Sequence, residues 1–159
     1  MKLKQHEPTL RTVVVQRFKH GRIDVKNPEH LGNFLLGWYA AEKWTRNRSL
    51  ITNLSRLFSY SGIAYRAPSK RGTFCPTSWS KDLNALKNFL GSDVTKGLII
   101  KARLVNALDL ASMAKWVIEQ THSNESDIHS ILDVKEVVCI TVPNHVETVQ
   151  QGLPYAELQ

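Results

Sequence analysis

The feature that most constrains the fold of this chain is a change in the spacing of its apolar residues at Gly62. Before this glycine, apolar side chains recur three and four residues apart, which is the spacing of one helical face. After it, short segments rich in β-branched residues alternate with helical stretches, and such segments are typical of strands. The pattern therefore predicts an α+β fold with a helical N-terminal region.

The boundaries of the expected elements follow from caps and turn residues. Asn27 followed by Pro28 is typical of a helix cap and a first helical residue, and Ser80 and Asp109 are further candidate caps. Helices are expected from residue 28, over 49–58, over 81–90 and from 110; strands are expected over 12–18, 63–67, 98–105 and 136–142. Residues 121–130 are expected to form a polar loop.

Length and composition favour a single domain. With 159 residues, of which 42% are hydrophobic, the chain is long enough for one sizeable core and short for two. We expect a basic, mainly helical region over residues 1–60, a core over residues 61–145 and a polar tail over residues 150–159.

The sequence also argues against several classes of protein. No apolar run approaches the roughly 18 residues that span a bilayer, and the polar start of the chain lacks the apolar centre of a signal peptide. Cys75 and Cys139 form no CxxC pair, which argues against a structural zinc site, and a cytoplasmic, reducing setting is expected. Neither standard glycine-rich phosphate loop is present, so a Rossmann or P-loop nucleotide site is not expected.

The charge of the chain is unevenly distributed. Residues 1–71 hold 14 Lys and Arg against 4 Asp and Glu, a net charge of +10, within a total of +7. Residues 72–159 hold 7 against 10, a net charge of −3. A basic region of this kind can contact a polyanion or an acidic protein surface. The alternative is a solvated charged face with no partner.

Three short motifs, far apart in the sequence, each pair a polar residue with β-prone neighbours. They are Tyr65-Arg66, Ser78-Trp79-Ser80 and Glu136-Val137-Val138. The planar, permanently charged guanidinium of an arginine suits an anionic cofactor, and a carboxylate can stabilise a cation that develops during a reaction. If the fold brings the motifs together, they form one active site.

In order and spacing these motifs resemble the R-S-E class of ADP-ribosyltransferases, the clostridial-toxin-like branch, over about residues 60–143. That family has an aromatic-Arg pair on its first core strand, and a catalytic Glu opens a late strand. Its Ser-x-Ser motif precedes a helix with a buried aromatic residue, here Phe89. The resemblance implies a core of two packed, mostly antiparallel β-sheets, NAD as the substrate and no metal. Small members of the class occur in bacteriophages and as bacterial effectors.

The resemblance also implies roles for single residues. The catalytic group would be Glu136, which hydrogen-bonds the ribose of NAD, with Arg66 on the NAD phosphates and Ser78 orienting Glu136. The backbone of Ala67 would pair with the nicotinamide amide. The remaining cofactor-binding residues would be Tyr65, Phe74, Trp79, Ser80 and Phe89, with Phe74 and Trp79 as candidates for stacking on the nicotinamide ring.

Acceptor recognition is expected beside the catalytic Glu. Many members of the family have Glu or Gln two residues before it, whereas this chain has Val134 there, flanked by Asp133 and Lys135. The departure weakens the case for arginine as the acceptor and leaves a nucleic acid or another protein side chain open. The resemblance thus predicts a mono-ADP-ribosyltransferase that modifies a macromolecule and does not contact membranes.

Two other functions remain open at the level of sequence. One is a nucleic-acid-binding module without catalysis, which would bind through the first 71 residues in a salt-sensitive way. The other is a degenerate member of the family that acts as an inhibitor through a retained fold. In both, Glu136 is a solvent-facing strand residue, Arg66 a surface ion-pair residue and Ser78 a turn or cap residue.

Overall fold

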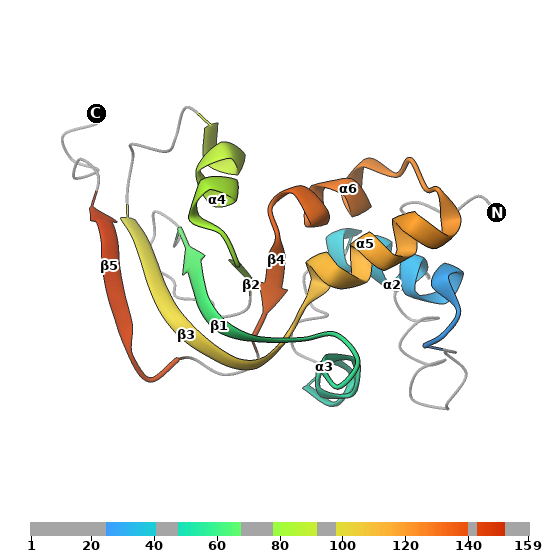
Figure 1. Cartoon of the computed structure of the whole chain (residues 1–159), viewed down its shortest axis with the longest axis horizontal. Helices are drawn as coiled ribbons and strands as arrows, with labels where there is room; N and C mark the ends of the chain where they lie inside the picture. The colour runs from blue at the N-terminus through green and yellow to red at the C-terminus, as the bar shows by residue number, and fades with distance from the viewer. Residues whose placement is uncertain (1–24, 41–47, 68–77, 92–97, 140–142, 152–159) are drawn as a thin grey trace.

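The computed structural model describes residues 25–40, 48–67, 78–91, 98–139 and 143–151, and the chain has an α+β architecture (Figure 1). A five-stranded antiparallel sheet lies on one side, and the helices α2, α5 and α6 gather on the other. In chain order the elements are α2 (Pro28–Ala40), α3 (Arg48–Ser55), β1 (Ser59–Arg66), β2 (Ser78–Ser80), α4 (Leu83–Leu90), β3 (Leu98–Leu108), α5 (Leu110–Thr121), α6 (Ser126–Asp133), β4 (Glu136–Val138) and β5 (Val146–Gln151).

The sheet curls back on itself. The long strand β3 pairs with β1 along most of its length and with β5 on its other edge. Strand β2 joins β1 to β4, and β4 returns to the end of β3, where Leu108 lies opposite Val138. The pairings β1–β2–β4–β3–β1 therefore form a ring, which the right-handed twist of a long strand and the bulge between Tyr60 and Gly62 both favour. The described strands thus form one curled sheet, in contrast to the two packed sheets expected from the resemblance.

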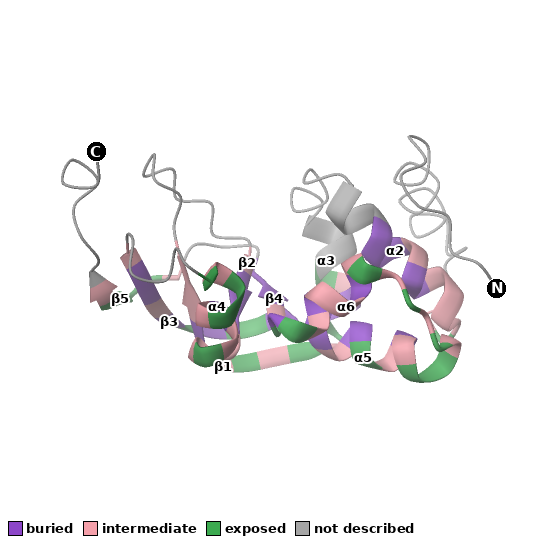
Figure 2. Ribbon diagram, turned by 90° about the horizontal axis from the view of Figure 1, so that it is seen from above, coloured by how far each residue is buried: buried purple, intermediate pink, exposed green. Residues whose placement is uncertain are grey.

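Two hydrophobic clusters hold this arrangement together. The larger cluster packs α2, α5 and α6 against the ends of β3 and β4, with Phe34 and Met113 fully buried. The second lies on the inner face of the curled sheet and includes Ala64, Trp79 and Val137. Figure 2 shows the buried positions, in purple, gathered on α2, α5 and α6 and along β2, β3 and β4. The sheet therefore has one buried face beneath the strands that carry the motifs.

The helix caps confirm two sequence predictions and correct a third. The Asn27 side-chain oxygen accepts the N–H of Glu29 at 3.0 Å at the start of α2, and Asp109 accepts the N–H of Ser112 at 3.0 Å at the start of α5. Helix α4, however, is capped by Asp82, whose carboxylate accepts the N–H of Ala85 at 2.9 Å. Ser80, the expected cap, is the last residue of β2.

Other boundaries differ because tertiary pairing overrides local pattern. Helix α3 ends at Ser55 rather than at residue 58, and Gly62 lies inside β1 at its bulge. Gly62 has φ 156°, and a Cβ there would lie 2.9 Å from the Tyr60 hydroxyl oxygen. Helix α6 occupies part of the expected loop over residues 121–130, and β5 was not expected at all.

Several expectations fall on parts of the chain that are not described. The early strand over residues 12–18 and the aromatic Phe74 lie outside the described residues. Among the residues that are described, no helix is long and apolar enough to cross a bilayer.

Candidate active site

The sheet register brings the three motifs side by side. Ser80 of β2 lies opposite Glu136 of β4, and it also lies opposite Tyr65 of β1. Residues directly opposite each other in antiparallel strands project from the same face of the sheet. Glu136, Ser80 and Tyr65 therefore form one row across three strands, although they come from distant parts of the sequence.

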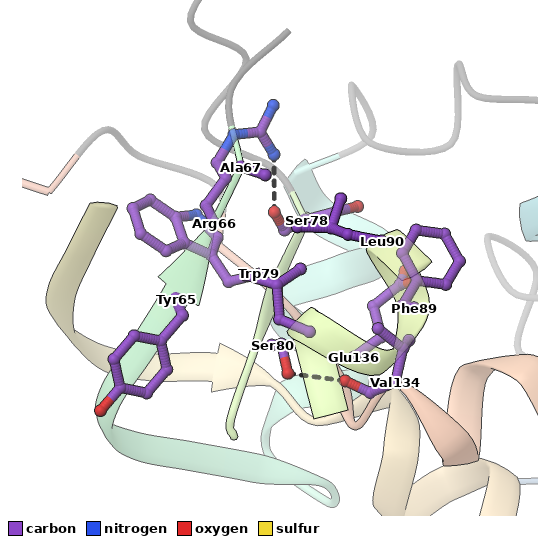
Figure 3. A pocket seen from close by; sticks show the side chains of 11 residues that line it. Tyr65, Arg66, Ala67, Ser78, Trp79, Ser80, Phe89, Leu90, Val134 and Glu136 are labelled. Carbon is purple, nitrogen blue, oxygen red and sulfur yellow. Dashed lines mark hydrogen bonds between the residues drawn. The ribbon is translucent and has the colours of Figure 1, made fainter. Parts of the chain in front are cut away.

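A pocket of about 280 Å³ opens beside this row (Figure 3). Strands β1, β2 and β4 form part of its wall, and the last turn of α4 forms another part. The lining residues are Tyr65, Arg66, Ala67, Ser78, Trp79, Ser80, Leu86, Phe89, Leu90, Val134 and Glu136. The fold thus joins all three motifs in one concave site. The sequence analysis missed Leu86 and Leu90, whose four-residue spacing on one face of α4 was the available signal.

Ser80 makes the contact that ties the site together. Its side chain is only 1% exposed, and its hydroxyl donates to the backbone oxygen of Val134 at 2.7 Å. The Ser80 hydroxyl oxygen accepts the N–H of Asp82 at 3.1 Å. Ser80 therefore links β2 and the start of α4 to the turn that precedes Glu136. Sequence analysis assigned the orienting role to Ser78, whereas Ser78 lies opposite Val138, two residues beyond Glu136.

Arg66 is held at the end of β1 by the second motif. Its Nη1 donates to the backbone oxygen of Ser78 at 2.6 Å, as the dashed line in Figure 3 marks. Because side chains alternate along a strand, the Arg66 side chain leaves β1 on the face opposite to Tyr65. It reaches Ser78 of β2, which lies two residues before Ser80, the residue that pairs with Tyr65. A bond from the charged group to a carbonyl sets the orientation of the planar guanidinium.

Backbone hydrogen bonds hold the turn before Glu136 in place. Lys135 has φ 53°, a left-handed conformation that is uncommon for a residue with a side chain. The Lys135 N–H donates to the backbone oxygen of Leu132 at 3.1 Å, and the Lys135 carbonyl accepts the N–H of Lys81 at 3.0 Å. These bonds fix the backbone on both sides of Lys135 and so determine where β4 and the Glu136 side chain begin.

The three residues expected to recognise the acceptor have different surroundings. Val134 is buried and lines the pocket. Lys135 is exposed, and its Nζ lies 3.3 Å from a carboxylate oxygen of Asp82. Asp133 is exposed at the end of α6 and is not among the lining residues. Of the three, only Val134 contributes to the pocket.

Trp79 and Phe89 have environments opposite to those expected for them. Trp79 is 3% exposed and belongs to the inner cluster of the sheet, so its ring is mainly a core residue. Phe89, expected to be buried, is 65% exposed at the edge of the pocket. Leu86, one turn earlier in α4, is buried, whereas Phe89 lies in the last turn of the helix, next to its C-terminal end at Leu90.

The Asp82 carboxylate, which caps α4, makes the stability of the folded protein depend on pH. Its bond from the Ala85 N–H, and next the Lys135 side chain, lower the pKa of Asp82 below the usual 3.8. A folded pKa below the unfolded one stabilises the folded state above about pH 3.8, and this is lost as the pH falls through the lower folded value. We expect Asp82→Asn, which keeps a capping oxygen, to lower the melting temperature near pH 7, and we expect this difference from the wild type to shrink as the pH falls below about 3.8. Thermal unfolding across this range tests the expectation, and an equal loss at both ends would contradict it.

The described part of the chain contains no obvious metal-binding group. Within those ranges, no group of three or more His, Cys, Asp or Glu side chains is placed to hold a metal ion. The chemical groups at the pocket are instead one carboxylate, one guanidinium and three hydroxyls with an apolar wall.

Comparisons of this chain with protein-family models, curated proteins and solved structures found no match.

Proposed function

We propose that the protein is a mono-ADP-ribosyltransferase with a site of the R-S-E type. It would cleave NAD at the nicotinamide–ribose bond and transfer ADP-ribose to a macromolecule. The observation that carries the proposal is that Arg66, Ser80 and Glu136, one residue from each of the three motifs, line the same pocket.

Glu136 supplies the electrostatic part of the mechanism. Departure of neutral nicotinamide leaves positive charge on the ribose ring, in a transition state similar to the oxocarbenium ion of glycoside cleavage. A carboxylate beside the ribose stabilises this cation more than the ground state, and this difference accelerates the step. Glu136 lines the pocket at the start of β4, and the row with Ser80 and Tyr65 fixes its backbone.

Arg66 supplies the site for the phosphates. The guanidinium carries several N–H donors in a planar fork, and its bond to Ser78 orients that fork at the rim of the pocket. A volume of about 280 Å³ lies just below the usual range for ligand pockets. It suits nicotinamide and its ribose, so the phosphates and the adenosine would lie at the rim, on the Arg66 side.

The apolar wall suits the nicotinamide ring. Leu86 and Val134 are buried members of this wall, and the Phe89 ring lies exposed at its edge. A flat aromatic ring beside an apolar wall binds a planar heterocycle by stacking and by exclusion of water. We assign Phe89, rather than Trp79, as the stacking residue.

We expect Phe89→Ala to raise the KM for NAD about tenfold, because one stacking contact contributes on the order of 1–3 kcal/mol. The free energy of unfolding should change by less than about 0.5 kcal/mol, because the side chain is mostly exposed. Leu57→Ala is the matched control, since Leu57 is 54% exposed in the turn after α3 and is not among the residues that line the pocket. An unchanged KM, or a KM raised equally by both changes, would contradict the assignment.

The proposed function is tested with NAD labelled on its adenylate phosphate. The protein is incubated with labelled NAD and a cell extract, and nicotinamide release is measured by chromatography. Protease and nuclease digestion of the labelled macromolecules then identifies the class of acceptor. We expect nicotinamide release together with label on a macromolecule. Absence of both at micromolar enzyme would exclude the transferase and favour a non-catalytic binding module.

A further inference from the structure

A second hollow lies on the open face of the sheet. It measures about 440 Å³ and is formed by β1, β3, β5 and the segment before β5. The lining residues are Ile63, Lys101, Ala102, Arg103, Val105, Asn144, His145 and Glu147. Along β3 the burial alternates, with Ala102 and Leu104 buried and Arg103 and Val105 exposed. The hollow is therefore on the solvent side of the strand and not in the core.

This hollow continues the row that contains Glu136 and Ser80. Tyr65 lies opposite Lys101, and Lys101 lies opposite Glu147. With the pairs described above, one row runs from Glu136 through Ser80 and Tyr65 to Lys101. Tyr65 lines the first pocket, and Lys101 lines the second. Residues directly opposite each other have Cα atoms roughly 4.5–5.5 Å apart, so the two hollows adjoin at this pair.

The second hollow is basic. Lys101 and Arg103 line it together with one carboxylate, that of Glu147. The Glu147 carboxylate lies 3.3 Å from Lys101 Nζ and 3.6 Å from His145 Nε2. Arg103 is exposed and forms no ion pair with the described residues. Two permanent cations against one anion leave a positive surface, whatever the protonation state of His145.

The shape of this surface suits an extended polyanion with planar groups. Lys101 and Arg103 are two residues apart on one face of a strand, which separates their Cα atoms by about 6.8 Å. Tyr65 lies opposite Lys101 on the same face of the sheet, and Val105, 72% exposed, extends the apolar part of the surface. An acidic peptide would need only the cations, whereas a single-stranded nucleic acid uses a basic track together with exposed rings on which its bases stack.

We propose that this face binds single-stranded nucleic acid as the acceptor, with phosphates on Lys101 and Arg103 and a nucleotide presented past Tyr65 to Glu136. This inference rests on the proposed function, since it identifies the acceptor of that reaction. The row of paired residues provides a direct path from the basic hollow to the pocket in which the ribose cation would form.

The test measures binding without NAD, so that it does not depend on catalysis. Fluorescein-labelled single-stranded DNA and RNA oligonucleotides are titrated with protein at several salt concentrations, and anisotropy is recorded. We expect the double variant Lys101→Gln with Arg103→Gln to bind at least about tenfold more weakly. Its plot of log affinity against log salt should be shallower by about 1.4, because each phosphate contact on a single strand contributes about 0.7.

The matched control is the double variant Arg56→Gln with Lys115→Gln. It removes the same charge from exposed positions in the helical part of the molecule, after α3 and on α5. The control should bind as the wild type does. The inference is wrong if the wild type does not bind the oligonucleotides, if the first double variant binds unchanged, or if both double variants weaken equally.

Nicotinamide release by the wild type separates this inference from the proposed function. Cleavage of NAD with transfer of label only to proteins would overturn the nucleic-acid surface and leave the transferase standing. Oligonucleotide binding that depends on Lys101 and Arg103, without any cleavage of NAD, would overturn the transferase and leave the binding surface standing.

Discussion

Glu136→Gln is expected to lower kcat/KM for NAD cleavage on the order of 10³-fold. The substitution keeps the size of the side chain and removes its charge, so the cation that forms on the ribose loses its counter-charge. Binding of NAD should change much less, because in the ground state the positive charge lies on the nicotinamide ring and reaches the ribose beside Glu136 only in the transition state. Nicotinamide release gives the rate, and titration with NAD gives the dissociation constant.

The control for this change is Glu119→Gln, the same substitution at an exposed position of α5. It should turn over NAD as the wild type does. If Glu136→Gln retains activity within about threefold of the wild type, Glu136 does not stabilise the reacting ribose. If the wild type binds NAD without cleaving it, the degenerate member of the family becomes the better description.

Trp79→Ala is expected to destabilise the protein by about 3–5 kcal/mol. The Trp79 ring is 3% exposed and packs in the inner cluster with Ala64 and Val137, so truncation leaves a cavity that the curled sheet cannot close. This amount is a large fraction of the usual stability of a small domain, roughly 5–15 kcal/mol. Urea unfolding followed by circular dichroism measures the loss.

Two comparisons make this result decisive. Trp79→Phe should cost much less, because it keeps most of the buried apolar volume. Phe89→Ala should cost almost nothing, because Phe89 is mostly exposed. A Trp79→Ala protein with unchanged unfolding but weakened NAD binding would show instead that the tryptophan is the stacking residue.

Local chemistry was sufficient to predict the elements whose signals lie within a few residues. The caps at Asn27 and Asp109 act over two or three residues, and both are observed. Strand β3 has a continuous β-branched and apolar run, and it extends only three residues past the expected end at residue 105. These signals survive because no tertiary contact opposes them.

Elements that depend on a partner strand were missed or misplaced. Strand β5 is an edge strand whose exposed residues Glu147 and Thr148 give no core pattern, and it is held by its pairing with β3. The Ser80 hydroxyl was expected to cap α4, yet it bonds to Val134, a residue 54 positions away. Such a bond cannot be inferred from spacing along the chain.

For the candidate site, the sequence by itself determined which chemical groups are present: an arginine, two serines and a glutamate in three motifs with β-prone neighbours. Only the tertiary structure decided that they meet, because the register of β1, β2 and β4 joins segments that are up to 71 residues apart, from Tyr65 to Glu136. It also decided which aromatic ring is accessible, burying Trp79 and exposing Phe89. The physical reason is that side-chain burial depends on which face of an element is covered by another, and that covering is a property of the whole fold.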